Sequence, residues 1–258
     1  MATRPLLHDQ SEGYEHLVQL YGSDDRSLVE NVGEFLREGL RRGDGLLVVA
    51  TAEHNEAFIQ YLKTESGYSR ATLEGRLVFR DAAATLALCL VDGKPDQVAF
   101  ERAVGEAMRE VRERVGHSGL RAYGEMVGIL WEEGRVGEAV QLETYWNTLL
   151  SVHRFSLFCA YPIDILDPAV ERGALGAVLC THTHLTPCHT DLERAVSRAM
   201  NEVLGARVES LRHMASVPEH RSGTEIPRAE ALILWLRSSF PDQAEEILDR
   251  ARAYVKAA

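Results

Sequence analysis

The chain has 258 residues, which is enough for one large hydrophobic core with an appendage. Its 39 acidic and 28 basic residues leave a formal net charge of -11, so the chain repels nucleic acid. It contains no apolar run of about 18 residues and no signal peptide, which argues against a membrane contact. We therefore expect a cytoplasmic protein whose four cysteines stay reduced.

The first half of the chain alternates predicted strands with predicted helices. Residues 15–21, EHLVQLY, favour a strand. Ser27 and Glu30 form a capping box, which predicts the start of a helix that ends near Arg42. The apolar run LLVVA at 46–50 is typical of a strand buried on both faces of a parallel sheet.

The same alternation continues beyond residue 75. Residues 76–80 predict a third strand, a short helix runs to about Val91, and residues 96–115 predict a long amphipathic helix. Two further strands are expected at 119–126 and 155–161. This order implies an α/β fold with a mostly parallel sheet and helices on both faces, in which ligands bind beyond the carboxyl ends of the strands. The rim predicted in this way contains residues 22–26, 51–54, 81, 125–127 and 161–164.

The densest group of functional side chains lies between residues 119 and 150. Period-two alternation places Arg121 and Glu125 on one face of a strand. Glu143 and Asn147 are one helical turn apart, at the edge of an apolar stripe that includes Trp146. These polar residues are expected to converge on one site. The alternative is that Arg121 and Glu125 form ion pairs with each other or with helix ends, and that Trp146 belongs to the core.

Residues 180–189, CTHTHLTPCH, hold many side chains that can bind metals. Their spacing matches no zinc template, because no CxxC is present and alternate residues of one strand cannot all face one ion. The preferred interpretation is a polar loop with pocket-facing histidines and no cofactor. If a metal binds, the candidates are His182, His184 and Cys188.

The C-terminal part differs in composition. Residues 214–227 lack periodicity and predict a linker that separates residues 1–213 from a helical hairpin at 228–258. The first hairpin helix is expected up to about Phe240, and Pro241 suits the first turn of the second. The apolar segment 231–236 must be covered by the second helix, by the main domain or by another copy of the chain, so a homodimer is one expectation.

Several segments together resemble the MEDS domain, the methanogen/methylotroph DcmR sensory domain. The resemblance spans roughly residues 14–200. It rests on HLVQLY at 16–21, FLREGLRRGDGLLVVAT at 35–51, RAYGEMVGILWEEG at 121–134, LETYWNTL at 142–149, FCAYP at 158–162 and HTHLTP at 182–187. The resemblance implies a RecA/KaiC-like fold that serves as a sensory module in prokaryotic signal transduction and transcription regulation, and that recognises small organic molecules.

The chain departs from KaiC-type ATPases at the phosphate loop. Those ATPases carry GxxxxGK[ST], whereas residues 21–27 read YGSDDRS, with two carboxylates and no lysine. Two carboxylates repel a triphosphate, and the missing lysine and glycine remove the counter-charge and the backbone cradle. We therefore do not expect ATP hydrolysis.

These observations favour a non-enzymatic sensor that binds a small organic ligand and signals to a protein partner. The residues expected to contact the ligand are His16, Asp24, Arg121, Glu125, Trp131, Glu143, Trp146, Asn147, His182 and His184. Two alternatives stay open. One is a divergent nucleotide- or metal-dependent hydrolase, and the other is a scaffold or anti-regulator whose pocket is vestigial and whose C-terminal hairpin binds the partner.

Overall fold

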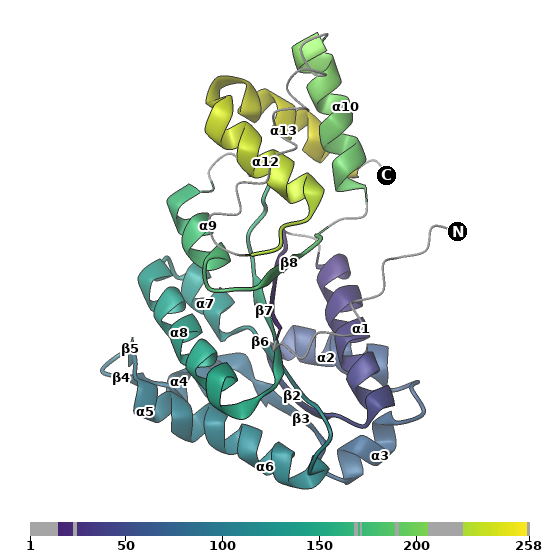
Figure 1. Cartoon of the computed structure of the whole chain (residues 1–258), viewed down its shortest axis with the longest axis vertical. Helices are drawn as coiled ribbons and strands as arrows, with labels where there is room; N and C mark the ends of the chain where they lie inside the picture. Colours follow the sequence, from purple (N-terminus) through teal and green to yellow (C-terminus); the bar gives the residue numbers. More distant parts are fainter. Residues whose placement is uncertain are drawn as a thin grey trace.

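The computed structural model describes residues 15–22, 25–167, 170, 172–188, 191–205 and 224–256. Its centre is a six-stranded sheet in which all neighbouring strands are parallel, in the order β3-β2-β6-β7-β1-β8. The strands are β1 (His16–Leu20), β2 (Gly45–Ala50), β3 (Leu77–Asp81), β6 (Leu120–Gly124), β7 (Ser156–Tyr161) and β8 (His184–Thr186). Helices lie on both faces (Figure 1), so the predicted α/β class is confirmed.

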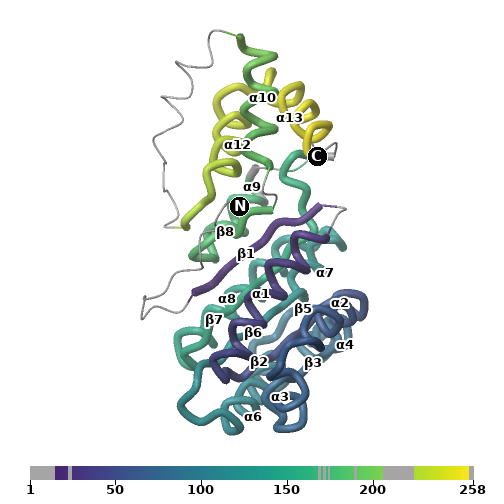
Figure 2. The backbone as a smooth tube through the Cα atoms, turned by 90° about the vertical axis from the view of Figure 1, so that its right-hand side faces the viewer, coloured from purple at the N-terminus to yellow at the C-terminus, as the bar shows by residue number. Residues whose placement is uncertain are grey.

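Alternation along the strands divides the core into two layers. Leu17 of β1 and Val48 of β2 face α1 (Arg26–Arg42), α2 (Ala52–Leu62) and α3 (Tyr68–Leu73). Val18 and Val49 face the other layer. That layer contains α4 (Ala82–Leu88), α5 (Gln97–Phe100), the π-helical turn η1 (Glu101–Gly105), α6 (Glu106–Val115), α7 (Met126–Glu132) and α8 (Val136–His153). Figure 1 shows α1 and α8 on either side of the sheet, and Figure 2, turned by 90°, shows α1 in front of the strands.

Local details differ from the sequence predictions at three places. The first helix takes Asp25 as its N-cap residue instead of the predicted capping box, and the Ser27 hydroxyl accepts a hydrogen bond from Gln19. The helix expected up to Val91 ends at Leu88, because a two-stranded hairpin, β4 (Leu90–Val91) and β5 (Lys94–Pro95), follows it. The polar loop predicted at 180–189 contains the three-residue strand β8, in which Leu185 is buried between the partly exposed His184 and Thr186.

The C-terminal helices form one group at the end of the molecule beyond β8 (Figure 1). This group contains α10 (Leu192–Leu204), α12 (Arg228–Ser239) and α13 (Pro241–Lys256), and α9 (Arg172–Leu179) lies between it and the sheet. The hairpin α12–α13 packs against α10 and buries Ile233, Leu236 and Ile247, whereas Leu232, Leu234 and Trp235 stay partly exposed, and the homodimer stays a prediction.

The predicted linker is described only in its last part. Glu225 accepts a backbone hydrogen bond from Leu185 of β8 and donates one to Thr183, so this segment extends the sheet edge. Residues 206–223, which contain the boundary at 213 and the rest of the linker, lie outside the described residues. The division into residues 1–213, 214–227 and 228–258 stays a prediction.

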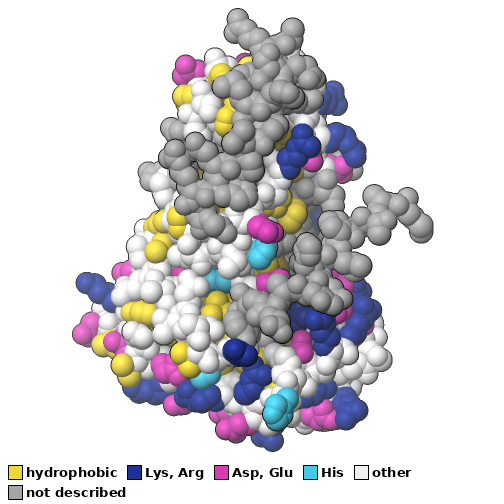
Figure 3. Space-filling model, in the orientation of Figure 1, with side chains coloured by type: hydrophobic (Ala, Val, Ile, Leu, Met, Phe, Trp, Pro, Cys, Tyr) yellow, Lys and Arg dark blue, Asp and Glu magenta, His cyan; other side chains and the backbone are white. Residues whose placement is uncertain are grey.

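The surface charges and the helices bear on two classes of partner, nucleic acids and membranes. On the face in Figure 3, the described acidic and basic side chains are intermixed and form no broad basic area. Within the described ranges, none of the helices combines the length and the apolar character that a bilayer crossing requires.

Candidate functional site

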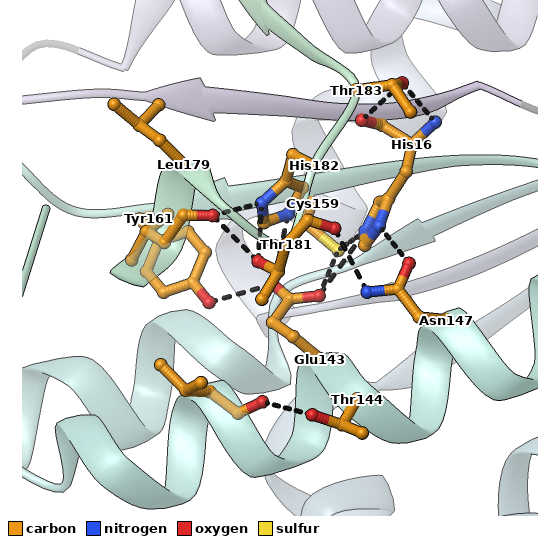
Figure 4. Close-up of polar contacts among 12 residues, drawn as sticks. His16, Glu143, Thr144, Asn147, Cys159, Tyr161, Leu179, Thr181, His182 and Thr183 are labelled. Carbon is orange, nitrogen blue, oxygen red and sulfur yellow. Dashed lines mark hydrogen bonds and ion pairs between the residues drawn. The ribbon is translucent and has the colours of Figure 1, made fainter. Parts of the chain in front are cut away.

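Four buried side chains that can bind protons or metals meet between the sheet and α8. We call His16, Glu143, Cys159 and His182 the inner cluster; one ligand atom from each lies within 4.8 Å of the others. The His16 Nε2 atom lies 3.3 Å from Glu143 Oε2 and 3.4 Å from Cys159 Sγ. His182 Nε2 lies 3.2 Å from Glu143 Oε1, without hydrogen-bond geometry. Figure 4 shows these side chains pointing toward one another.

Secondary structure explains how distant residues meet in the inner cluster. Strand alternation puts His16 on the same face as Val18, and the parallel register sets Val18 beside Cys159 of β7. Glu143 projects from the middle of α8, which covers this face. His182 follows the end of α9, where its backbone N–H donates to Leu179 O.

Hydrogen bonds behind the rings fix how the two histidines point. Asn147 donates through Nδ2 to Thr181 O at 3.0 Å, which leaves its Oδ1 to accept from His16 Nδ1 at 3.0 Å. His182 Nδ1 lies 2.7 Å from Val178 O, which can only accept. Both histidines therefore carry a proton on Nδ1 and direct Nε2 into the inner cluster.

Burial and mutual charge shift the pKa values in the inner cluster in different directions. Burial lowers the pKa of His16, and the neighbouring His182 lowers it further. Burial disfavours the charged carboxylate of Glu143, but His182 and His16 outweigh this and hold its pKa well below the usual range. Burial and the Glu143 charge raise the pKa values of Cys159 and Tyr161 well above their usual ranges. Tyr161 donates to Glu143 Oε1 at 2.8 Å.

A second group lies where the strands end, on the opposite face of the sheet. We call Asp25, His54 and Glu125 the rim cluster. Glu125 Oε2 accepts the Thr51 backbone N–H at 2.7 Å, and Oε1 contacts His54 Nδ1. The other ring nitrogen of His54 lies 3.1 Å from Asp25 Oδ2. Because carboxylates only accept, this geometry suits a His54 protonated on both nitrogens.

The rim cluster has different titration properties and more access to solvent. Burial lowers the pKa of His54, but the hydrogen bonds and charges of Glu125 and Asp25 outweigh it, so the pKa is raised. The Asp25 side chain is 42% exposed, which connects the group to solvent. Tyr21 contacts the His54 ring edge-on, and burial followed by the Glu125 charge raises the pKa of its hydroxyl.

The structure brings four of the ten expected ligand-contact residues together, namely His16, Glu143, Asn147 and His182. Glu125 lies in the rim cluster. Arg121 lies on the α1 face, where it forms an ion pair with Asp44 at 3.0 Å and donates to Phe35 O. It does not pair with Glu125, because β6 ends between them and His54 takes the carboxylate.

The remaining expected residues lie apart from both clusters. Trp146 is fully buried in the core, edge-on to Phe100 at 5.2 Å between ring centroids. Trp131 packs edge-on against Tyr161. His184 is partly exposed and faces Glu225 at 3.3 Å, and Cys188 donates to Glu230, so neither joins His182. Asp24 lies outside the described residues.

The ten expected contact residues do not include Cys159 of the inner cluster, nor His54 and Asp25 of the rim cluster. The predicted rim, however, contains 22–26, 51–54 and 125–127, and the structure does bring Asp25, His54 and Glu125 together there. A signal was present for Cys159, because FSLFCAY alternates and places Cys159 on the same face as Tyr161. A hollow of about 180 Å³ lies elsewhere, between β2, α4 and η1. Its lining consists of Leu47, Val49, Arg80, Thr85, Leu88, Ala103, Val104 and Ala107.

Comparison with known proteins identifies the family. A family model described as MEDS, the MEthanogen/methylotroph, DcmR Sensory domain, matches residues 15–217. The match covers well over half of the chain and includes every described residue of both clusters. Comparison with curated proteins gives no match. Because so much of the chain fits this one family model, the chain belongs to the family of methanogen/methylotroph DcmR sensory domains.

Proposed function

We propose that this domain is a non-enzymatic sensor that binds a small, uncharged or cationic organic ligand at the rim cluster. The observation that carries the proposal is the position of Glu125. Its carboxylate accepts the Thr51 N–H at 2.7 Å, at the N-terminus of α2, and contacts His54; helix N-termini are common binding sites for anions such as phosphate. The Glu125 carboxylate therefore already accepts the hydrogen bond from the Thr51 N–H, and this N–H is not free to bind an anionic ligand.

Charge also supports recognition without nucleotide turnover. The sequence of residues 21–27 contains two aspartates and no lysine, so it resembles a RecA/KaiC-type phosphate loop that has lost its chemistry. Asp25 and Glu125 flank one histidine, which leaves this region with one net negative charge when His54 is protonated. Such a region repels a triphosphate and favours neutral or positive groups.

Ring contacts around His54 supply the apolar part of a binding site. Tyr21 lies edge-on to the ring at 5.8 Å between centroids, and Phe58 stacks on it at 6.0 Å. The Tyr123 hydroxyl is buried near Glu125 without a hydrogen bond of good geometry. Aromatic walls with a few polar groups are typical of sites for small organic molecules.

A chain of contacts connects the rim to the C-terminal helices. A Cβ atom at Gly22 would lie 3.3 Å from the Asp164 Cβ atom, and Asp164 forms an ion pair with Arg252 of α13 at 3.1 Å. Arg237 of α12 donates to the carbonyl groups of Ile165 and Asp167. We infer that a ligand which moves Gly22 and Asp25 shifts α12 and α13, where a protein partner binds differently as a result.

The experiment is a binding screen on the full chain. Thermal unfolding is followed with small alcohols, amines, halogenated hydrocarbons, carboxylic acids and ATP with Mg²⁺, and hits are measured by calorimetry. We expect stabilisation by a neutral or cationic compound, weakened in Glu125→Gln and retained in Glu56→Gln, which changes an exposed glutamate on the same helix as His54. Tight binding or hydrolysis of ATP, or equal affinity in both variants, would contradict the proposal.

A further inference from the structure

We infer that the inner cluster is a closed binding site for a single Zn²⁺ ion, with His16 Nε2, His182 Nε2, Glu143 and Cys159 Sγ as its ligands. This site lies on the opposite face of the sheet from the rim cluster and does not depend on the function proposed there. The inference rests on four observations: the spacing of the ligand atoms, the orientation of the rings, the charge balance, and a set of four protein ligands that leaves no coordination position open.

The spacing of the ligand atoms fits a tetrahedral site. Zinc bonds of about 2.0–2.1 Å to nitrogen or oxygen and about 2.3 Å to sulfur give ligand-to-ligand distances of about 3.3–3.6 Å around a tetrahedron. Three ligand atoms lie at mutual distances close to this range: His16 Nε2 to Glu143 Oε2 at 3.3 Å, His16 Nε2 to Cys159 Sγ at 3.4 Å and Cys159 Sγ to Glu143 Oε2 at 3.6 Å. The fourth, His182 Nε2, lies 3.2 Å from the other carboxylate oxygen, Glu143 Oε1, and the four ligand atoms of the cluster all lie within 4.8 Å of one another.

The orientation of the rings is the one that zinc requires. Asn147 Oδ1 and Val178 O hold the Nδ1 protons of His16 and His182, so each ring directs Nε2 inward, where loss of any proton on Nε2 to solvent leaves a lone pair for the ion. Metal-bound histidines commonly use such outer partners to fix their tautomer. His182 Nε2 is a buried polar atom with no hydrogen bond, which indicates that its own partner is a cation.

Charge balance also favours a divalent ion. A carboxylate from Glu143 and a thiolate from Cys159 together carry two negative charges, which balance the two positive charges of Zn²⁺. On binding, the Cys159 thiol loses its proton to solvent, and no electron is transferred. All four side chains are buried, so a neutral assembly avoids the large cost of an uncompensated charge in the interior.

Closure points to a structural ion. The protein supplies four ligands and Tyr161 further binds Glu143 through its hydroxyl at 2.8 Å, so no coordination position is left for a substrate. The ligands come from β1, α8, β7 and the turn before β8. A bound zinc ion would therefore join the edge of the sheet to α8 and to the turn that follows α9.

The test uses the full chain, expressed with zinc in the medium and analysed for metals by mass spectrometry. We expect about one zinc per chain, and a chelator-treated sample whose melting temperature rises by roughly 5–10 °C at a zinc concentration 100 times Kd. Cobalt substitution should give thiolate-to-cobalt charge-transfer absorption. A folded chain that binds no zinc and gains no stability from it would overturn the inference.

Variants identify the ligands. Cys159→Ala should remove the charge-transfer absorption, whereas Cys89→Ala, which changes another buried free cysteine, should retain it. Asn147→Ala keeps all four ligands but frees the His16 ring, so zinc affinity should fall about 10–100-fold. Absorption that persists in Cys159→Ala would show that the metal binds elsewhere and would overturn the assignment. Should Cys159→Ala fail to fold, the zinc content and cobalt spectrum of the unmodified chain still decide.

Discussion

The inner cluster and the rim cluster are both built from histidines and carboxylates, yet they lie on opposite faces of one sheet and differ in access to water. Glu143 and His16 are at most 1% exposed, whereas the Asp25 side chain of the rim cluster is 42% exposed. The pKa of His16 is lowered, with burial as its largest cause, while the pKa of His54 is raised by its two carboxylates against the effect of burial.

The difference shows how the same residue types acquire different roles. In the inner cluster, each Nδ1 atom is bonded outward and each Nε2 atom points inward, which favours one shared cation. In the rim cluster, both ring nitrogens of His54 face carboxylates, which favours the form of His54 that is protonated on both nitrogens. The environment on each face of the sheet decides which form is stable.

The largest expected effect is on the buried carboxylate. Glu143→Ala should lower the free energy of unfolding by about 3–5 kcal/mol, because two buried imidazoles and the Tyr161 hydroxyl lose their common partner. Urea unfolding measures the change. Glu138→Ala on the same helix is the control, and its partly exposed ion pair with Arg135 should contribute at most about 1 kcal/mol. Equal effects of the two substitutions would contradict the comparison.

The second effect concerns the rim carboxylate. Glu125→Ala should cost about 1–3 kcal/mol in urea unfolding, because the Thr51 N–H and His54 lose an acceptor. The loss should be smaller than that for Glu143, since Asp25 remains beside His54 and water can enter. Glu56→Ala on α2 serves as the exposed control. A larger loss at Glu125 than at Glu143 would reverse the ranking of the two clusters.

The pH dependence of stability measures how much the protonated form of His54 contributes to the free energy of unfolding. The folded pKa of His54 is raised, so its stabilising effect is complete below the unfolded pKa of about 6.5 and is lost as the pH rises through the folded pKa. The groups that face the ring are Glu125, Asp25 and Tyr21. The difference in unfolding free energy between the unmodified chain and His54→Gln should therefore shrink as the pH rises. A difference that grows with pH would show that His54 is neutral in the folded chain.

The smallest effect on stability is expected at the contact between the rim and α13. Arg252→Gln removes the ion pair with Asp164 and should cost about 0.2–1 kcal/mol. Its effect on signalling should be larger. A ligand that protects α13 from hydrogen exchange in the unmodified chain should lose this remote protection in Arg252→Gln while it still binds. Unchanged protection would exclude this contact as the route.

Much of the fold could be predicted from the sequence because its signals are local. Continuous apolar runs such as LLVVA predicted β2, and the change from a period of two to a period near four separated β6 from α8. Errors occurred where neighbours override local preference. Ser27 carries a capping signal, but Gln19 binds its hydroxyl and Asp25 takes the N-cap position.

Only part of the candidate site could be predicted from the sequence. The spacing of Glu143 and Asn147 predicted that both reach one site, and both do contact His16. The sequence pattern did not predict the ion pair of Arg121 with Asp44, which lies in the turn before β2. The predicted rim placed 51–54 near 125–127 but did not single out His54 as the partner of Glu125. The metal-capable segment 180–189 contributes His182 alone to the inner cluster, while His184 and Cys188 face other residues.

Local patterns in the sequence are enough to predict most of the succession of strands and helices along the chain, the parallel sheet and the absence of a lysine at residues 21–27, because each depends on residues that are close in the chain. That His16, Glu143, Cys159 and His182 share one buried site is known only from the folded chain. Strand order and register are set by packing across the whole sheet, and β1 lies between β7 and β8 although more than 130 residues separate it from them in the chain. Such long-range contacts leave no local pattern from which they could be read.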